Sequence, residues 1–412
     1  MKKIFIIITL ASMCFGTIGA AGKKVKPQLF LGMVPEPHEY EWYSEQAQAW
    51  ASETRKDPSS EQAWKYYFMS AFYMAQTNIE DTLLVDSIVN DMELHIKDTY
   101  TYNYCKFRQT IGMKDVPGEV AYSYAYKALE MLPKEKDFFD FDVMLAFCAT
   151  HKNCPQLQAL ATEYFNSGIY SPYVLDFTRN ELRAIPSNAI YIGNADVNII
   201  PKWILCYGNN EFTGIYGINF NMLTYEDGLS KICDDLGITD CFHFPETYET
   251  REEYLDTIYS AIRFIKEKTG RPIYFTTQNS IDDAPWNEYL YHEGLSYKYS
   301  EEDYDILPVI QHNLESVYDL KTMQQPSVKD AWYASDNLAL EYVIAVSYAL
   351  YGYAKQHDKP HAKWAYNIGK KIISGINYDK EGKKYFLEDL TPLYECAMKG
   401  LNPEEVLYNE EE

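Results

Sequence analysis

The stretch Ala189-Ile190-Tyr191-Ile192-Gly193-Asn194-Ala195-Asp196 decides the fold of this chain, because the sequence pattern changes there. Four apolar residues followed by a short polar segment are typical of a buried strand that ends in a turn. Further strands are expected over residues 213–220, 272–275 and 295–299, and helices over residues 197–207, 223–236 and 254–268. This alternation predicts a small three-layer α/β domain over residues 183–300, with a mainly parallel sheet.

Upstream of this stretch, residues 27–180 show the spacing of apolar residues that is typical of helices. Prolines close successive helical segments at Pro58, Pro133 and Pro172, which are separated by 75 and 39 residues. These separations are close to two repeats and one repeat of a unit of about 34–40 residues, so the region resembles a degenerate tetratricopeptide (TPR-like) array. An irregular helical domain is the alternative that the same pattern leaves open.

The C-terminal region, residues 310–405, is again helical, with helices expected over residues 337–355 and 362–374. The turn His357-Asp358-Lys359-Pro360 would join these two helices as a hairpin, because proline interrupts one helix and is tolerated at the start of the next. The fold class expected for the whole chain is therefore α+β and mostly α. It combines a TPR-like N-terminal domain, a small α/β domain and a C-terminal helical hairpin.

Residues 1–21 have the three parts of a secretory signal peptide. Met1-Lys2-Lys3 is positively charged, an apolar stretch follows, and Ala20-Ala21 offers small residues for cleavage. The segment that ends at Cys14 is similar to a lipoprotein signal, but Met13 is larger than the residue usual before such a cysteine, so we expect no lipid anchor there. No later segment has the run of about 20 apolar residues that a membrane span needs. We therefore expect export to the periplasm or cell surface without stable membrane insertion.

The chain is acidic, with a formal net charge of −23 from 60 acidic and 37 basic residues. Nucleic acids and anionic lipids are bound through cationic surfaces, so this composition argues against both as partners. The chain has eight cysteines, and an exported protein can form disulfides. We expect one local bridge, either Cys148–Cys154 or Cys233–Cys241, and buried free thiols at most other positions.

Short motifs after residue 182 carry a resemblance to a known family. They are Ile185-Pro186-Ser187-Asn188-Ala189-Ile190, the spacing of Asp196, Pro201 and Trp203, Ile218-Asn219-Phe220-Asn221-Met222-Leu223, Arg271-Pro272-Ile273-Tyr274-Phe275, and His292-Glu293-Gly294-Leu295-Ser296-Tyr297-Lys298. Through these motifs, residues 182–400 resemble the soluble C-terminal region of membrane-embedded glycosyltransferase-like proteins related to protein O-mannosyltransferases. The resemblance implies a glycosyltransferase-associated domain.

The chain departs from that family in two ways. Its N-terminal half is expected to be soluble and helical, whereas the family has a membrane-spanning region in which sugar transfer is expected. In addition, Asn198 stands where the family tends to have a second acid after the one matched by Asp196. The resemblance therefore does not imply that this chain transfers sugar from a lipid carrier.

Polar residues gather at the ends of three of the expected strands. Asn194, Asp196 and Asn198 follow the first strand, Asn219 and Asn221 end the second, and Thr276, Thr277 and Gln278 end the third. Ligands of open α/β sheets bind beyond the carboxyl ends of the strands, so these residues predict a site for a small ligand or a glycan. The alternative is that they only cap helices and close turns.

Several enzyme signatures do not occur in the sequence, among them Gly-x-Ser-x-Gly, the phosphate-binding loop, His-Glu-x-x-His and Cys-x-x-Cys. His292-Glu293 is interpreted as part of a packed strand, and Pro360 interrupts the pair His357 and His361, so no metal and no cofactor is expected. The sequence thus favours an exported, non-catalytic protein that binds a protein or glycan partner. The alternatives are a glycan-acting enzyme that uses Asp196 and an accessory subunit of a membrane glycosyltransferase.

Overall fold

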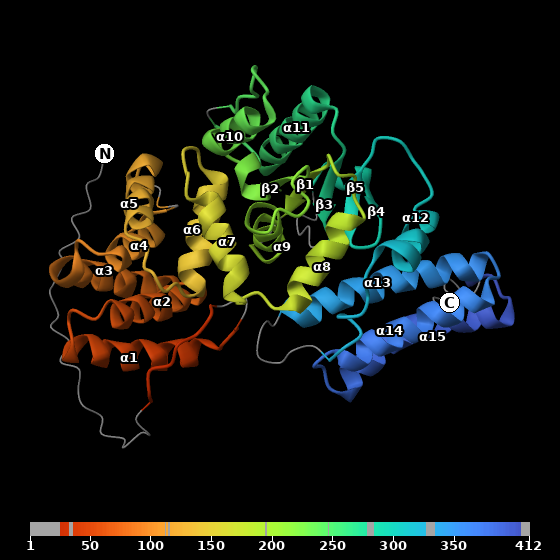
Figure 1. Ribbon diagram of the computed structural model, residues 1–412, viewed down its shortest axis with the longest axis horizontal. Helices are drawn as coiled ribbons and strands as arrows, with labels where there is room; N and C mark the ends of the chain where they lie inside the picture. The colour runs from red at the N-terminus through yellow and green to blue at the C-terminus, as the bar shows by residue number, and fades with distance from the viewer. Residues whose placement is uncertain are drawn as a thin grey trace, which may run out of the picture.

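The computed structural model describes residues 25–32, 36–111, 113, 116–193, 196–245, 247–277, 284–326 and 334–404. The predicted signal peptide lies outside these residues. Most of the described chain is helical and one small sheet lies near its middle, which confirms an α+β fold that is mostly α. Figure 1 shows the sheet between a wing of N-terminal helices and a wing of C-terminal helices.

In the described part of the chain, eight α-helices precede the sheet. They are α1 (Tyr40–Lys56), α2 (Glu61–Thr77), α3 (Thr82–Ile96), α4 (Tyr100–Thr110), α5 (Gly118–Glu130), α6 (Phe138–Thr150), α7 (Leu157–Ser167) and α8 (Pro172–Arg183). Several of them begin at a side-chain cap, as at Ser60, whose hydroxyl accepts from the backbone N–H of Ala63 at 3.3 Å. Helices that follow one another in the chain contact each other from α1 to α7, so this wing is built largely from local contacts.

The sheet has five strands in the order β2-β1-β3-β5-β4. They are β1 (Ile190–Gly193), β2 (Tyr216–Asn219), β3 (Ile273–Thr276), β4 (Leu290–His292) and β5 (Ser296–Tyr299). Strands β2, β1 and β3 are parallel, whereas β5 pairs antiparallel with both β3 and β4. The four predicted strands are present, and β4 is an additional one.

The sheet is therefore mixed and not mainly parallel, and the reason lies in the connection between β4 and β5. Only three residues separate these strands, and Gly294 adopts a φ of 111° in the turn between them. A connection this short can only join antiparallel strands, since a parallel crossover needs a dozen residues or more. Glycine adopts this left-handed backbone conformation without steric cost.

Helices cover both faces of the sheet, which gives the three layers that the sequence predicts. Ile190, Ile192 and Phe275 pack in one buried cluster with α10 (Glu226–Leu236) and α11 (Arg251–Thr269). Tyr191 and Tyr274 alternate with these residues along the strands and pack in a second cluster with α9 (Asp196–Trp203). Helix α11 matches its prediction closely, since Thr250 caps its start and Gly270, with a φ of 62°, ends it.

Four α-helices follow the sheet among the described residues, namely α12 (Leu307–His312), α13 (Ala334–Lys355), α14 (Lys359–Gly375) and α15 (Lys380–Lys399). The predicted hairpin is formed by α13 and α14, and Asp358 caps the second of these helices. Helix α15, which was not predicted, contacts both α13 and α14, so the hairpin becomes a three-helix layer. Pro392 lies inside α15 and breaks the helical sequence pattern there.

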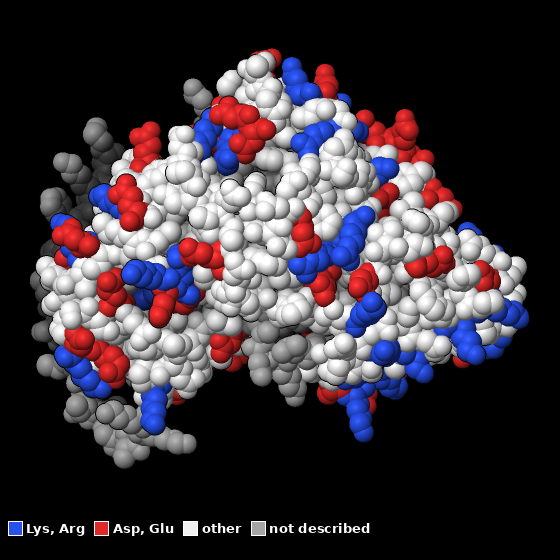
Figure 2. Space-filling view, viewed as in Figure 1, with Lys and Arg blue, Asp and Glu red and all other residues white. Residues whose placement is uncertain are grey.

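The buried cluster on the α9 face is continuous from Phe30 in the N-terminal wing to Ala397 in α15. The helical wings and one face of the sheet therefore share a core. Within the described residues, no helix is both long enough and apolar enough to cross a membrane. In the face shown in Figure 2, acidic and basic side chains are interspersed and are not gathered by sign.

The structure decides between the two disulfides left open by the sequence. Cys233 and Cys241 are bonded, and the bridge joins α10 to the segment that follows it. Cys148 and Cys154 are free, as are Cys105, Cys206 and Cys396. Four of these five free thiols are buried, as expected.

Candidate ligand-binding site

The predicted site residues lie in two separate places. Asn219 and Asn221 line a cavity between the N-terminal wing and the sheet. Asn198 and Thr277 instead lie beside the ends of β1 and β3, where α9 and α13 approach the sheet. Three further positions, Asn194, Gln278 and the side chain of Asp196, lie outside the part of the structure that is described.

The cavity has a volume of about 620 Å³, within the range of small-molecule sites. Helices α4, α5 and α6 form one side, and the end of β2 with the short helix η3 (Phe220–Leu223) forms the other. The residues that line it are Phe107, Arg108, Ile111, Met113, Val116, Gly118, Tyr122, Asp142, Val143, Ala146, Phe147, Thr150, His151, Asn219, Asn221, Met222 and Tyr225. Apolar and aromatic side chains dominate, and a few polar groups converge among them.

The sheet side of the cavity is shaped by the end of β2. The side-chain oxygen of Asn219 accepts from the backbone N–H of Asn221 at 3.0 Å, which caps η3 and turns the chain toward the helices. Asn219 is buried and Asn221 is exposed. The capping interpretation of these residues is therefore correct for Asn219, and the same turn also places both amides at the cavity.

The helical side supplies a cation and an imidazole. Arg108 extends from α4 with its guanidinium 4.7 Å from the ring centre of Phe72, and its buried Nε has no hydrogen-bond partner in the described structure. Nδ1 of His151 lies 3.1 Å from the carbonyl oxygen of Phe147, whereas its buried Nε2 has no partner there. Burial lowers the pKa of His151, so its imidazole is neutral near pH 7.

Aromatic rings enclose these polar groups. The His151 ring stacks on Phe147 with centres 4.1 Å apart and meets Tyr122 edge to face at 4.3 Å. Tyr225 lines the cavity from the sheet side, and burial raises its pKa to about 12. Thr150 of α6 and Tyr225 thus line the cavity from its two walls.

An ion pair also joins the two walls. Lys152, just after α6, lies 2.6 Å from the carboxylate of Asp234 and donates to Ser230 at 2.8 Å, and both partners belong to α10. The side chains of this ion pair are 42% and 60% exposed, so solvent screens their attraction. The pair can align the walls but contributes little to stability.

The second place, beside the ends of β1 and β3, contains a buried chain of hydrogen bonds. Asn198 of α9 donates to the hydroxyl of Thr276, and this hydroxyl acts on the nearby Tyr191 by lowering its pKa against the larger effect of burial. The Tyr191 hydroxyl donates to the carboxyl of Glu181, in α8, at 2.7 Å. Burial raises the pKa of Glu341, in α13, and the side chain of Thr277 opposes this rise. Asn198 and Thr277 were predicted for this edge, whereas neither glutamate was.

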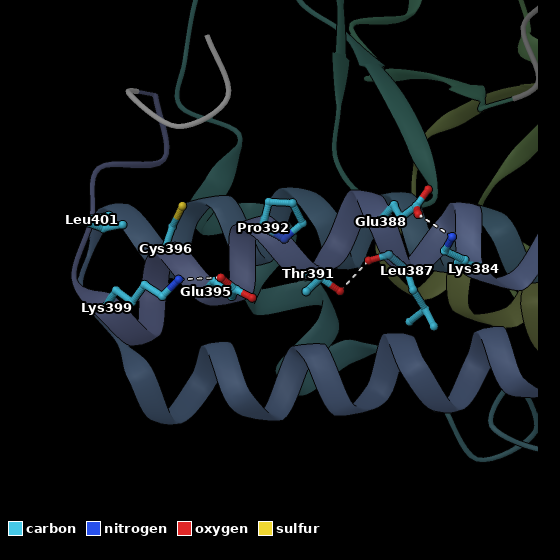
Figure 3. A pocket seen from close by; sticks show the side chains of 9 residues that line it. All are labelled: Lys384, Leu387, Glu388, Thr391, Pro392, Glu395, Cys396, Lys399 and Leu401. Carbon is cyan, nitrogen blue, oxygen red and sulfur yellow. Dashed lines mark hydrogen bonds and ion pairs between the residues drawn. The ribbon is translucent and has the colours of Figure 1, made fainter. Parts of the chain in front are cut away.

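A third hollow, of about 510 Å³, lies along the exposed side of α15 (Figure 3). Its charged groups pair along the helix, Lys399 with Glu395 at 2.6 Å and Lys384 with Glu388 at 3.5 Å. Since most of its lining residues come from one helix, it presents a helix surface with satisfied charges and offers no convergent polar groups. We do not regard it as the functional site.

The other residues considered for catalysis or metal binding are structural in this fold. His292 ends β4 and is buried, and the loss of water contact lowers its pKa to about 4. Glu293 accepts from the hydroxyl of Tyr304 at 2.7 Å. His361 lies 2.7 Å from Asp358 at the start of α14. Among the described residues, no group of three or more histidines, cysteines or acids could hold a metal ion.

Comparison with known protein families, with curated proteins and with solved structures finds no match to this chain. The resemblance of residues 182–400 to the glycosyltransferase-like family therefore stays a prediction. The role of the site has to be argued from its geometry.

Sequence reasoning did not find the helical half of the cavity. Arg108 is part of an aromatic-rich helix, and His151 follows the end of another, so neither has neighbours in sequence that indicate a site. Tyr122 has the spacing of a packing residue. The one signal available was the cluster of asparagines at the end of β2, which marks the sheet side alone.

Proposed function

We propose that this chain is an exported, non-catalytic binding protein whose cavity between the N-terminal helices and the sheet holds a small uncharged saccharide. The observation that carries the proposal is the composition of that cavity. Aromatic rings and asparagine amides from two parts of the fold converge on a volume of about 620 Å³. Sites of this kind use apolar walls for affinity and a few polar groups for orientation.

A saccharide fits this lining better than a purely apolar ligand. Sugar rings present C–H faces that pack on aromatic side chains such as Tyr122, Phe147 and Tyr225. Hydroxyl groups both donate and accept, which suits a lining that contains donors at Arg108 and acceptors at Asp142. One cation and one carboxylate balance each other, and His151 is neutral, so the lining favours an uncharged ligand.

Export is part of the proposal and is supported by two features. Residues 1–21 have the pattern of a signal peptide. In addition, the disulfide between Cys233 and Cys241 is typical of a protein in an oxidising compartment.

Binding can be tested by calorimetry and saturation-transfer NMR with a panel of neutral mono- and disaccharides and with glucuronate as a charged counterpart. We expect at least one neutral sugar to bind and glucuronate to bind more weakly. Tyr122→Ala should weaken binding by about tenfold or more, because it removes an aromatic wall and a hydroxyl. Tyr385→Ala is the matched control, since Tyr385 is 64% exposed on α15, far from the cavity lining.

Two results would overturn the proposal. One is the absence of binding for every neutral sugar at about 10 mM, a concentration that detects even weak sites. The other is a Tyr122→Ala variant that binds sugar as tightly as the unaltered protein. The melting temperature of each variant is measured alongside, so that loss of fold is not taken for loss of binding.

A further inference from the structure

The ring of His151 is part of the helical wall of the cavity. His151 follows the last residue of α6 and is one of the lining residues. Its ring stacks on Phe147 with centres 4.1 Å apart and meets the edge of Tyr122 at 4.3 Å. Because Phe147 belongs to α6 and Tyr122 to α5, the ring packs between two helices that both line the cavity.

The hydrogen bonds of this ring determine which of its nitrogens carries the hydrogen. Nδ1 lies 3.1 Å from the carbonyl oxygen of Phe147, which can only accept, and 3.0 Å from the hydroxyl of Thr150. That hydroxyl donates its own hydrogen to the carbonyl oxygen of Ala146 at 2.8 Å, so it accepts from Nδ1. The neutral ring therefore carries its hydrogen on Nδ1 and a lone pair on Nε2.

The other nitrogen, Nε2, is buried and has no hydrogen-bond partner among the described residues. Protonation adds an N–H donor and a positive charge at this atom. A buried donor without an acceptor and a buried charge without water are both costly. Burial accordingly lowers the pKa of His151. The position between Phe147 and Tyr122 therefore suits the neutral ring and disfavours the protonated one.

The charged groups that act on this ring do not reverse that preference. Asp227 of α10 favours the protonated ring, whereas Lys231 of the same helix opposes it, and burial outweighs either effect on the pKa of His151. Burial raises the pKa of both tyrosines in the lining, so their hydroxyls stay neutral in acid. The other titratable groups that line the cavity are Arg108 of α4, Asp142 of α6, and the tyrosines Tyr122 and Tyr225.

We infer that His151 makes the cavity sensitive to pH: proton uptake drives its ring out from between Phe147 and Tyr122 and lowers the affinity of the cavity for its ligand. The protonated ring needs water at Nε2, and it reaches water by turning away from its buried position. Its departure removes one ring from the lining and loosens the packing between α5 and α6. The effect on affinity rests on the proposed saccharide site, whereas the movement of the ring does not.

The movement of the ring can be followed by NMR on the full-length mature protein between about pH 7.5 and about pH 4.5, the range around the usual histidine pKa. His151→Gln identifies the resonances of the ring. At the higher pH we expect nuclear Overhauser contacts between this ring and those of Phe147 and Tyr122. These contacts should disappear as the ring titrates, while circular dichroism shows that the chain stays folded. The inference is overturned if the contacts persist in the protonated protein, or if the ring stays neutral over the whole range.

The affinity is measured by calorimetry with glucose, galactose and mannose over the same range. Below the pKa of His151 in the free protein, each further pH unit should weaken binding by about tenfold, because only the neutral form binds. His151→Gln cannot titrate and should not show this fall. His361→Gln is the matched control and should show it, because the side chain of His361 is 51% exposed on α14.

The two parts of the experiment separate this inference from the proposed function. If none of the three sugars binds at about pH 7.5, the effect on affinity falls with the saccharide site, and the NMR contacts alone decide whether the ring moves. If a sugar binds equally well to the neutral and the protonated protein, or if His151→Gln shows the same fall, the inference is overturned while the proposed function stands.

Discussion

Two regions of this protein bury carboxyl groups, and they differ in whether a cation lies beside the buried acid. In the N-terminal wing, the Lys65 ammonium lies between Asp137, at 2.8 Å, and Asp140, with which it makes an ion pair. At the sheet edge, Glu181 accepts one bond from Tyr191 and has no cation beside it in the described structure. Lys65, Asp140 and Glu181 are all at most 6% exposed, so the difference is one of partners and not of depth.

Burial removes water from both carboxyl groups, and the two regions offset this desolvation penalty differently. A cation can offset the water that a buried carboxylate loses: burial raises the pKa of Asp140, and the neighbouring ammonium of Lys65 opposes this rise. Without a cation, the carboxyl binds a proton instead, and this is why burial raises the pKa of Glu181 to about 8. The first region is fixed by its ion pair, whereas the protonation of the second stays responsive to pH.

Removing the cation of the first region should have the largest effect. Lys65→Met keeps the length of the side chain but leaves Asp137 and Asp140 facing each other without a counter-ion. We expect the free energy of unfolding at pH 7 to fall by about 3–5 kcal/mol, the usual cost of breaking a buried pair. Chemical denaturation with urea measures this loss.

Lys56→Met is the matched control, because Lys56 pairs with Glu53 on the surface with its side chain 59% exposed. It should change the free energy of unfolding by less than about 1 kcal/mol. If both lysine variants lose the same stability, the triad around Lys65 does not differ from a surface pair and the comparison fails.

Replacing the lone acid of the second region should have an intermediate effect that depends on pH. The pKa of Glu181 rises from 4.5 to about 8 on folding, so the folded state binds the proton more tightly. Its stabilising contribution is complete below pH 4.5 and is lost as the pH rises toward 8. The free energy of unfolding of the unaltered protein should therefore fall by an amount on the order of a few kcal/mol over this pH window. Glutamine cannot titrate, so we expect Glu181→Gln not to show this fall.

The measurement is the free energy of unfolding of the unaltered protein and of Glu181→Gln at several values between pH 5 and pH 8. The difference between the two proteins should shift in favour of the variant as the pH rises. A constant difference across this window would show that Glu181 keeps the same protonation state in the folded and unfolded chains.

The smallest effect on the free energy of unfolding is expected for an exposed ion pair that, like the buried pair of Lys65, joins a lysine to an aspartate. Lys152→Met breaks the contact with Asp234 of α10, where both side chains face water. We expect a loss of about 0.5 kcal/mol, because solvent and salt screen such pairs. A loss as large as that of Lys65→Met would mean that the two walls of the cavity depend on this contact.

Local features of the fold could be predicted from the sequence. The strand Ile190–Gly193 was visible as a short apolar run before a polar turn, and α11 was visible from its apolar spacing between Thr250 and Gly270. Strand β4 could not be predicted from the sequence, because its three residues are too few to show an alternating pattern. Helix α15 was hidden by Pro392, which tertiary contacts with α13 and α14 accommodate.

The candidate sites depended on contacts between distant segments. Polar strand ends at Asn198, Asn219 and Thr277 were predicted to form one site, but η3 turns Asn219 toward the helices while α9 and α13 enclose the other two. Glu181 and Glu341 are 160 residues apart, and a single glutamate in a helix is usually on the surface. Nothing in the sequence shows that these two are neighbours.

The sequence by itself determined which segments form strands and helices and which strand ends carry polar groups, because apolar spacing, caps and turn residues act over a few neighbouring positions. Only the tertiary structure decided which polar groups meet, and whether a buried acid such as Asp140 or Glu181 receives a lysine or a proton. The physical reason is that desolvation and charge pairing depend on the surroundings of a side chain, and segments far apart in the sequence build those surroundings.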